Sequence, residues 1–218
     1  MELYIHSMSP PCWSVLLLGR QLDLKIKSKI LNFETEEHLK EDFIKLNPEH
    51  TVPTLVDGDF VLSESRAILS YLMDAYAKEN HPFYPRDAKT RALIQHRLNF
   101  DLGTLYSRFY AYCSPMWNKK VTSTEAQRDK LYDALGFLET YLGRNRYAAG
   151  DHLTIADISL VASVSAIDLC FVKLEKYPKV VAWYERCKKE LQGYEDVVGS
   201  QFEGFRKFLT VPAESGSE

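Results

Sequence analysis

Hydrophobic and polar residues follow different periodicities in the two parts of the chain. Up to about residue 76, short apolar runs alternate with patterns of helical spacing, whereas from residue 89 onward only helical spacing remains. The apolar runs predict four strands, and in the second of them apolar residues alternate strictly with polar ones, so that its lysines would face solvent. These strands are expected over residues 3–6, 24–30, 54–56 and 60–62.

Helices are predicted in the intervals between these strands. Pro10-Pro11 suits a loop and the first turn of a helix, because the first turn needs no N–H from proline. A second helix over residues 36–46 is stopped by Asn47-Pro48, and a third begins with Ser63 as its N-cap. The resulting β-α-β-α-β-β-α order is that of an α/β thioredoxin-like domain, which is expected over residues 1–77.

The rest of the chain predicts an all-helical domain. Residues 78–88 combine two prolines with polar residues, which interrupts both periodicities and predicts a linker. Thr154 and Asp157 form a capping pair, and the helix that they open is apolar nearly all round, which indicates the buried centre of a bundle. The domain is expected over residues 89–209, with further helices over 89–113, from a Thr122–Glu125 capping box to Leu142, from Pro178 and over 195–209, and with a disordered tail over 210–218.

The stretch from His50 to Arg66 combines several features that suit ligand binding. Asp57-Gly58 between two apolar runs predicts a tight hairpin. The helix start that follows offers free N–H groups next to a serine and an arginine, which is a ready site for an anion. An X-Pro bond exists in either isomer, and a cis Val52-Pro53 bond would turn the backbone of Val52 outward to pair with an extended ligand; the sequence leaves the isomer open.

Composition and charge exclude several functional classes. The 218 residues are 45% hydrophobic and 26% charged, with a net charge of -3, so the chain lacks the basic footprint expected of a nucleic-acid-binding protein. No apolar run has the length of a membrane helix, and the first residues start a strand rather than a signal peptide, so a cytoplasmic protein is expected. The four cysteines lie far apart and are expected to be reduced, and the spacing of the six histidines predicts no metal site.

These motifs, in this order, resemble a cytosolic glutathione S-transferase of the insect delta/epsilon type. The likeness extends from Leu3 to about Leu209. Ser9-Pro-Pro-Cys12 resembles the catalytic serine loop of that family. The other segments that carry the likeness are Glu37–Leu39 and Leu46–Leu55 for the glutathione strand, Glu64–Ile68 for the γ-glutamyl site, and Phe100–Tyr106 with the Thr154–Asp157 capping box for the helical domain.

The resemblance implies an activity and assigns roles to residues. It implies a homodimeric glutathione transferase that conjugates glutathione, its co-substrate, to small hydrophobic electrophiles in detoxification; no other cofactor is expected, and a glutathione-dependent peroxidase side activity is compatible with it. Ser9 would donate a hydrogen bond to the sulfur and so favour the thiolate. Glutathione itself would be held by His38 and His50 at its glycyl carboxylate, by Val52 and Pro53 along its cysteinyl backbone, and by Glu64, Ser65 and Arg66 at its γ-glutamyl end.

The same resemblance places an apolar electrophile site between the two domains. Its wall is expected to consist of Tyr106, Phe109, Tyr110, Met116, Trp117, Phe202 and Phe205. Asp101 would support the glutathione site by pairing with Arg66, while Thr154 and Asp157 would serve the fold. Two residues depart from the family pattern, since Trp13 stands where arginine is usual and Ser114 where the delta-type pocket has tyrosine. Both departures affect substrate choice rather than the fold.

Other interpretations of these residues remain open at this level. Judged by spacing alone, Ser9 is a loop or cap serine, the Phe202/Phe205 stripe belongs to a core, and Glu64 with Arg66 is a solvated pair. One alternative function is a protein that binds glutathione or apolar ligands without turnover. Another is a thiol-disulfide oxidoreductase acting through Cys12, which is disfavoured because Ser9 replaces the first cysteine of a CxxC motif. The sequence does not separate the delta class from the epsilon class.

Overall fold

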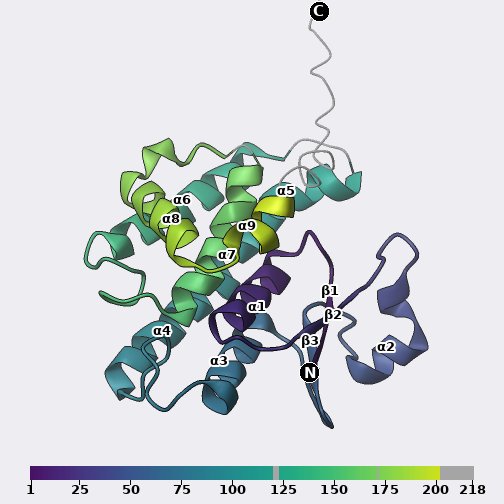
Figure 1. The fold of residues 1–218 in the computed structure, drawn as a ribbon. Coiled ribbons are helices and arrows are strands. Elements are labelled where there is room, and N and C mark those ends of the chain that lie inside the picture. The colour runs from purple at the N-terminus through teal and green to yellow at the C-terminus, as the bar shows by residue number, and fades with distance from the viewer. Residues whose placement is uncertain (120–122, 171, 202–218) are drawn as a thin grey trace, which may run out of the picture.

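The fold has an α/β part followed by a bundle of helices, as Figure 1 shows. The computed structural model describes residues 1–119, 123–170 and 172–201. Helix α7, Ile155–Leu169, runs through the middle of the bundle and packs against α1, Pro10–Gln21, of the α/β part. The predicted fold class, a thioredoxin-like domain joined to an all-helical domain, is confirmed.

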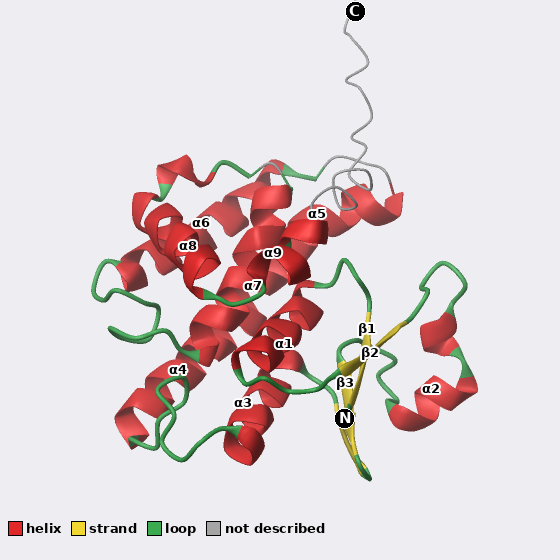
Figure 2. Ribbon diagram, in the orientation of Figure 1, coloured by secondary structure: helices red, strands yellow, loops and turns green. Residues whose placement is uncertain are grey.

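The α/β part is built on one four-stranded mixed sheet (Figure 2). Its strands lie in the order β2-β1-β3-β4. Strands β1 and β2 are parallel, which requires the crossover through α1, whereas β3 is antiparallel to both β1 and β4. The strand bounds are Glu2–Ile5 for β1, Lys27–Ile30 for β2, Thr54–Asp57 for β3 and Phe60–Leu62 for β4.

The helices of this part cover both faces of the sheet. Helices α1 and α3, Ser65–Tyr76, pack together on one face, while α2, Glu41–Leu46, lies on the opposite side (Figure 1). The face covered by α1 and α3 is apolar, and residues such as Leu3, Leu17 and Leu72 are fully buried there. Burial of this surface is the main force that holds the helices on the sheet.

Strand register brings four separate segments to one edge of the sheet, namely the edge that is formed by the ends of its strands. The carboxyl end of β1 lies beside the carboxyl end of the parallel strand β2, because Ile5 is opposite Ile30. The amino end of β3 lies at the same edge, with Thr54 opposite Tyr4, and so does the carboxyl end of β4, with Leu62 opposite Leu55. The loops that follow β1 and β2, the loop that precedes β3 and the start of α3 therefore converge there.

The helical part surrounds α7. Every residue of α7 except Asp168 is buried, which confirms its predicted place at the centre of the bundle. The other elements are α4 Ala88–Phe100, a π-helical turn over Asp101–Tyr106, α5 Ser107–Lys119, α6 Glu125–Leu142, α8 Pro178–Glu190 and α9 Tyr194–Val197. Short 3₁₀ turns occur at Glu37–Leu39, Leu174–Lys176 and Gly199–Gln201.

Asp157 anchors the start of α7, as predicted. Its fully buried carboxylate accepts hydrogen bonds from both the N–H and the hydroxyl of Thr154, each at 2.9 Å. The same carboxylate accepts from the N–H of Ala148 at 2.8 Å and from the indole N–H of Trp183 at 2.9 Å. Asp157 therefore joins the helix start to the preceding loop and to α8.

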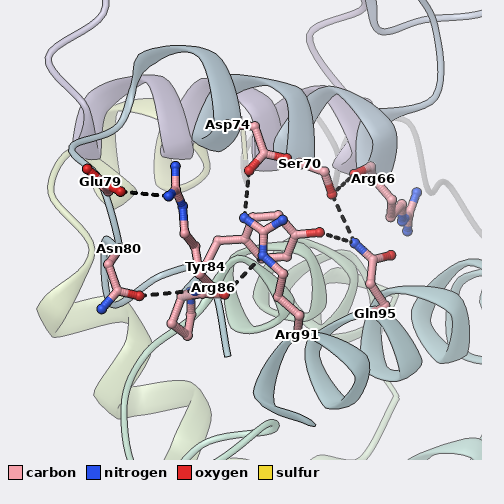
Figure 3. Close-up of polar contacts among 10 residues, drawn as sticks. Arg66, Ser70, Asp74, Glu79, Asn80, Tyr84, Arg86, Arg91 and Gln95 are labelled. Atoms are coloured by element: carbon pink, nitrogen blue, oxygen red, sulfur yellow. Dashed lines mark hydrogen bonds and ion pairs between the residues drawn. The ribbon is translucent and has the colours of Figure 1, made fainter. Parts of the chain in front are cut away.

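The segment between α3 and α4 is tied to both helices by polar contacts (Figure 3). Arg91 of α4 pairs with Asp74 of α3 at 2.6 Å and lies over the ring of Tyr84, 3.9 Å from its centroid. Gln95 donates to the Tyr84 hydroxyl at 2.6 Å and to Ser70 at 3.2 Å. These contacts fix the path of the chain from one part of the molecule to the other.

Several predicted boundaries in the α/β part are wrong. The strand expected over residues 24–30 is confined to β2, where Ile30 is 65% exposed and Lys29 turns back to pair with Glu2 at 2.5 Å. The helix expected over residues 36–46 is divided into a 3₁₀ turn and α2, because the backbone of Lys40 is extended. Strict alternation predicted too long a strand, because the length of β2 is set by its pairing with β1.

Boundaries in the helical part also differ from the predictions. Thr124 with Gln127, rather than Thr122 with Glu125, forms the capping box of α6, and Thr122 lies outside the described residues. The helix expected over 89–113 comprises α4, the π-helical turn and α5, which continues through Pro115. Of the helix expected over 195–209, the described part contains α9 and one 3₁₀ turn; the remainder and the tail lie outside the described residues.

Two general expectations concern membranes and thiols. Within the described ranges, no helix combines the length and the apolar character needed to cross a membrane. The four cysteines are all buried and unpaired, which agrees with the expectation of reduced thiols.

Candidate active site

Ser9 lies in the loop after β1 and is the N-cap of α1. Its backbone is fixed on both sides, since its N–H donates to the carbonyl of His6 at 3.0 Å and its carbonyl accepts from Trp13 at 3.1 Å. Its side chain makes no capping bond to the helix backbone, so the hydroxyl is not occupied in closing α1. A hydroxyl at a helix N-terminus is well placed to donate to an anion, because the helix dipole adds to its effect.

Cys12 lies in the first turn of α1, in surroundings that do not favour a reactive thiol. Its side chain is fully buried, and burial raises the pKa of the thiol to about 12, against a smaller lowering by a hydrogen bond with Ser9. Because the thiolate is the reactive species, this environment disfavours thiol-disulfide exchange through Cys12. This environment therefore argues against the oxidoreductase alternative.

The loop before β3 presents the backbone of Val52. The Val52–Pro53 peptide bond is cis, which settles the isomer that the sequence left open. Within the described part of the chain, no hydrogen bond uses the N–H or the carbonyl of Val52. Val52 is thus available to pair with an extended ligand backbone at the edge of the sheet.

Asn47, which was predicted only to end a helix, holds this loop in place. Its buried side chain donates to the Thr51 carbonyl at 3.1 Å and to the Thr54 hydroxyl at 3.0 Å, while its carbonyl oxygen accepts from Glu49 at 3.0 Å. The signal in the sequence is weak, because hydroxyl residues four and seven positions after an asparagine are common. Asn47 therefore supports the loop that presents Val52.

The start of α3 differs from the prediction in a way that matters for binding. Glu64, not Ser63, is the N-cap, and Ser63 instead donates to Glu49 at 3.1 Å. Glu64 has φ 67° and ψ 102°, a backbone conformation that non-glycine residues adopt rarely and that concentrates at functional sites. Glu64 is exposed, and the first N–H groups of α3 follow shortly after the carboxyl end of β4, where a helix N-terminus can bind a carboxylate.

A buried ion pair connects this helix start to the helical part. Arg66 donates to Asp101 at 2.6 Å and to the hydroxyl of Ser65 at 2.9 Å, so the predicted Arg66–Asp101 pair is confirmed. The same Asp101 oxygen accepts from Ser159 at 2.5 Å. The other Asp101 oxygen and Nε of Arg66 are buried without a partner in the described part of the chain. Asp101, which lies in the π-helical turn, therefore orients Ser65 through Arg66.

His38 and His50 lie near each other but in different settings. Their ring centroids are 6.3 Å apart; His38 is half-buried on a 3₁₀ turn, and His50 is exposed with φ 46° in the loop before β3. His6, which was not among the predicted site residues, precedes the Ser9 loop and is half-buried. Burial lowers the pKa of His6, with a smaller lowering by His38 and an opposing effect of Glu34. These imidazole side chains offer ring N–H donors to an acidic group.

The predicted apolar wall is only partly placed by the structure. Tyr106 lies in the π-helical turn, with its ring 5.3 Å from the guanidinium carbon of Arg66 and 6.4 Å from the ring of Tyr110. Burial raises the pKa of Tyr106, so its hydroxyl keeps its proton. Phe109 is fully buried in the core and offers no surface to a ligand in this structure. The side chains of Met116 and Trp117, and the whole of Phe202 and Phe205, lie outside the described residues.

Comparison with known proteins identifies this arrangement. Residues 1–74 match the family model of the glutathione S-transferase N-terminal domain, and residues 122–186 match that of the C-terminal domain. Over 192 residues, the chain is 45% identical to glutathione S-transferase D7 of Anopheles gambiae, which covers 88% of each protein. The chain belongs to the glutathione S-transferase family. It is a glutathione transferase and binds glutathione.

Solved structures agree with this identification of the transferase. A delta-class glutathione transferase of Nilaparvata lugens superposes with a TM-score of 0.92 at 39% identity, covering 95% of this chain and 97% of the other. An epsilon-class glutathione S-transferase of Musca domestica gives a TM-score of 0.89 at 35% identity, covering 95% and 96%. The transferase is thus similar to insect proteins of both classes.

Proposed function

We propose that this transferase activates glutathione through Ser9 and adds the resulting thiolate to small hydrophobic electrophiles. The observation that carries the proposal is the convergence of Ser9, the Val52–Pro53 backbone and the start of α3 at one edge of the sheet. Ser9 donates a hydrogen bond to the sulfur, and the N-terminus of α1 adds its dipole, so both favour the charged thiolate. Ser9 acts on the charge of the sulfur and is not itself a nucleophile.

The other subsites follow the chemistry of the tripeptide. Its cysteinyl backbone pairs with Val52, and its γ-glutamyl carboxylate is bound by Ser65 and the free N–H groups of α3, with Glu64 near the ammonium group. Its glycyl carboxylate is bound by His38 and His50. Arg66 acts on the γ-glutamyl subsite through Ser65, and Asp101 acts through Arg66.

The electrophile occupies an apolar site beside Tyr106, between the sheet edge and the helical part. Tyr106 and Tyr110 are the described members of its wall, and Met116, Trp117, Phe202 and Phe205 complete it in this proposal. Aromatic walls of this kind accept many hydrophobic substrates, which suits detoxification. The reaction uses glutathione as its co-substrate and requires no further cofactor, since thiolate addition needs neither a metal nor a redox group.

The assembly and location of the protein are also proposals. We infer a homodimer formed through α3 and α4, where a cavity of about 280 Å³ lies beside Glu64 and Arg66 and where the apolar side chain of Leu102 is 41% exposed. A second subunit that covers Leu102 would remove its apolar surface from water, which favours association. A cytoplasmic location is supported by the four unpaired cysteines.

Replacement of Ser9 tests the proposed activation. Ser9→Ala is expected to lower kcat/KM for glutathione and a chlorodinitrobenzene electrophile by about 10- to 100-fold, which is the loss of one charge-assisted hydrogen bond. Ser7→Ala, in the same loop, is the control and should stay within about threefold of the wild type. Wild-type activity in Ser9→Ala would remove Ser9 from the mechanism. Glutathione binding without measurable turnover in the wild-type protein would favour a binding protein instead.

A further inference from the structure

Three aromatic rings connect the Ser9 loop with the proposed glycyl subsite. The rings of Phe33 and His38 are stacked, with centroids 4.0 Å apart and planes inclined by 17°. The ring of His6 also contacts Phe33, at a centroid distance of 4.9 Å and an inclination of 50°. Because the carbonyl of His6 accepts the N–H of Ser9, the stack reaches the backbone of the catalytic loop.

Sheet register explains why these rings meet. Strands β1 and β2 are parallel and end together, and the pairing continues one step further, since the N–H of Leu31 donates to the carbonyl of Ile5 at 2.9 Å. His6 directly follows Ile5, and Phe33 comes two residues after Leu31. The two chains therefore leave the sheet side by side and bring His6 and Phe33 into contact.

The loop after β2 then returns to place His38 against Phe33. The N–H of Asn32 donates to the Glu37 carboxylate at 2.9 Å, and the N–H of Glu37 donates to the Asn32 carbonyl at 3.0 Å. These bonds close a short loop that contains Phe33 at its start and is followed at once by His38. They fix the backbone, but none of them reaches the imidazole.

The orientation of His38 therefore depends on its ring contacts. It lies on a 3₁₀ turn of three residues, and its Nδ1 is buried without a hydrogen-bond partner in the described part of the chain. The stacked face of Phe33 is the closest ring contact that His38 makes among these residues, since His50 is 6.3 Å away. Phe33 itself remains 36% exposed, more than a residue serving only the core would be.

We propose that Phe33 is a positioning residue that holds the His38 imidazole ready for the glycyl carboxylate of glutathione, with His6 supporting Phe33 from the Ser9 loop. The inference rests on the proposed role of His38 and extends it to two residues outside the predicted site. A preoriented donor binds more tightly because less conformational freedom is lost on binding. The energy of one aromatic stack corresponds to an effect of about three- to tenfold on binding.

The test compares glutathione with γ-glutamylcysteine, which lacks the glycyl carboxylate that His38 is proposed to bind. Phe33→Leu keeps the apolar bulk and removes the ring, and should raise the KM for glutathione about three- to tenfold while changing the KM for γ-glutamylcysteine less than twofold. Phe33→Tyr retains the stack and should keep the wild-type KM for glutathione. Phe60→Leu, an exposed phenylalanine on β4, is the matched control and should change neither KM.

A double-mutant comparison completes the test. His38→Ala should show the same selective rise, and Phe33→Leu combined with His38→Ala should be no worse than His38→Ala alone, because both changes remove one function. Equal effects of Phe33→Leu on both thiols, a rise in the KM of the electrophile instead, or an additive double variant would each overturn the inference. A silent His38→Ala would reject both the glycyl assignment and this inference, whereas a selective His38→Ala with a silent Phe33→Leu would reject the inference alone.

Discussion

Asp101→Ala is expected to destabilise the transferase by about 3–5 kcal/mol and to weaken glutathione binding at the same time. The change leaves the Arg66 guanidinium buried without its counter-ion, which is the costly way to break a buried pair. It also removes the partner that orients Arg66 toward Ser65. For a chain of this length the melting temperature should fall by about 6–20 °C, as measured by circular dichroism.

Two further variants separate stability from binding. Asp74→Ala breaks the more exposed Asp74–Arg91 pair between the same two parts of the chain, and should cost no more than about 1 kcal/mol. Arg66→Met combined with Asp101→Leu replaces the pair by apolar side chains and should recover much of the lost stability. It should not recover glutathione affinity, measured by calorimetry. Recovery of both would mean that the pair serves only the fold.

Asp157→Ala is expected to destabilise the protein by at least about 3 kcal/mol while leaving the chemistry of the folded enzyme intact. Four donors around the carboxylate, from Ala148, Thr154 and Trp183, would lose their shared acceptor in a buried site. The melting temperature should fall by about 6–12 °C or more. The cooperative unit that is weakened contains α7, which packs against both α1 and the other helices.

The control for this variant is Asp151→Ala, an exposed carboxylate in the loop just before α7. It should melt within about 2 °C of the wild type, because a surface carboxylate contributes little. At a temperature where Asp157→Ala is folded, its kcat/KM should equal that of the wild type within about threefold. A normal melting temperature for Asp157→Ala, or a large loss of activity in the folded variant, would contradict its assignment to structure.

The fold was predictable because its information is local. The spacing of apolar residues distinguishes strands from helices, and the capping pair Thr154–Asp157 marks the start of a helix within four residues. What the sequence did not predict depends on distant contacts. The positive φ of Glu64 moved the start of α3, and the extended Lys40 divided the predicted helix over residues 36–46.

The candidate site shows the same division. The family resemblance gave Ser9, Ser65 and the Arg66–Asp101 pair, because each is part of a short motif at fixed spacing. The resemblance did not reveal the π-helical turn that holds Asp101, since a single turn of six residues between two α-helices is too short to change the helical pattern of the whole stretch. Nor did it reveal Asn47, whose hydroxyl partners follow it at a common spacing, or the His6–Phe33 contact, which the register of β1 and β2 produces.

The most direct test of the account is the ionisation of bound glutathione. The ultraviolet absorbance of the thiolate would be titrated against pH in the wild type, in Ser9→Ala and in the Ser7→Ala control. If Ser9 stabilises the thiolate, the bound thiol should ionise at least about one pH unit below free glutathione in the wild type and in the control. Such a shift needs about 1.4 kcal/mol per unit. Ser9→Ala should lose this shift. A bound thiol that titrates as in free solution in the wild type, or a shift that survives Ser9→Ala, would contradict the claim that Ser9 stabilises the thiolate.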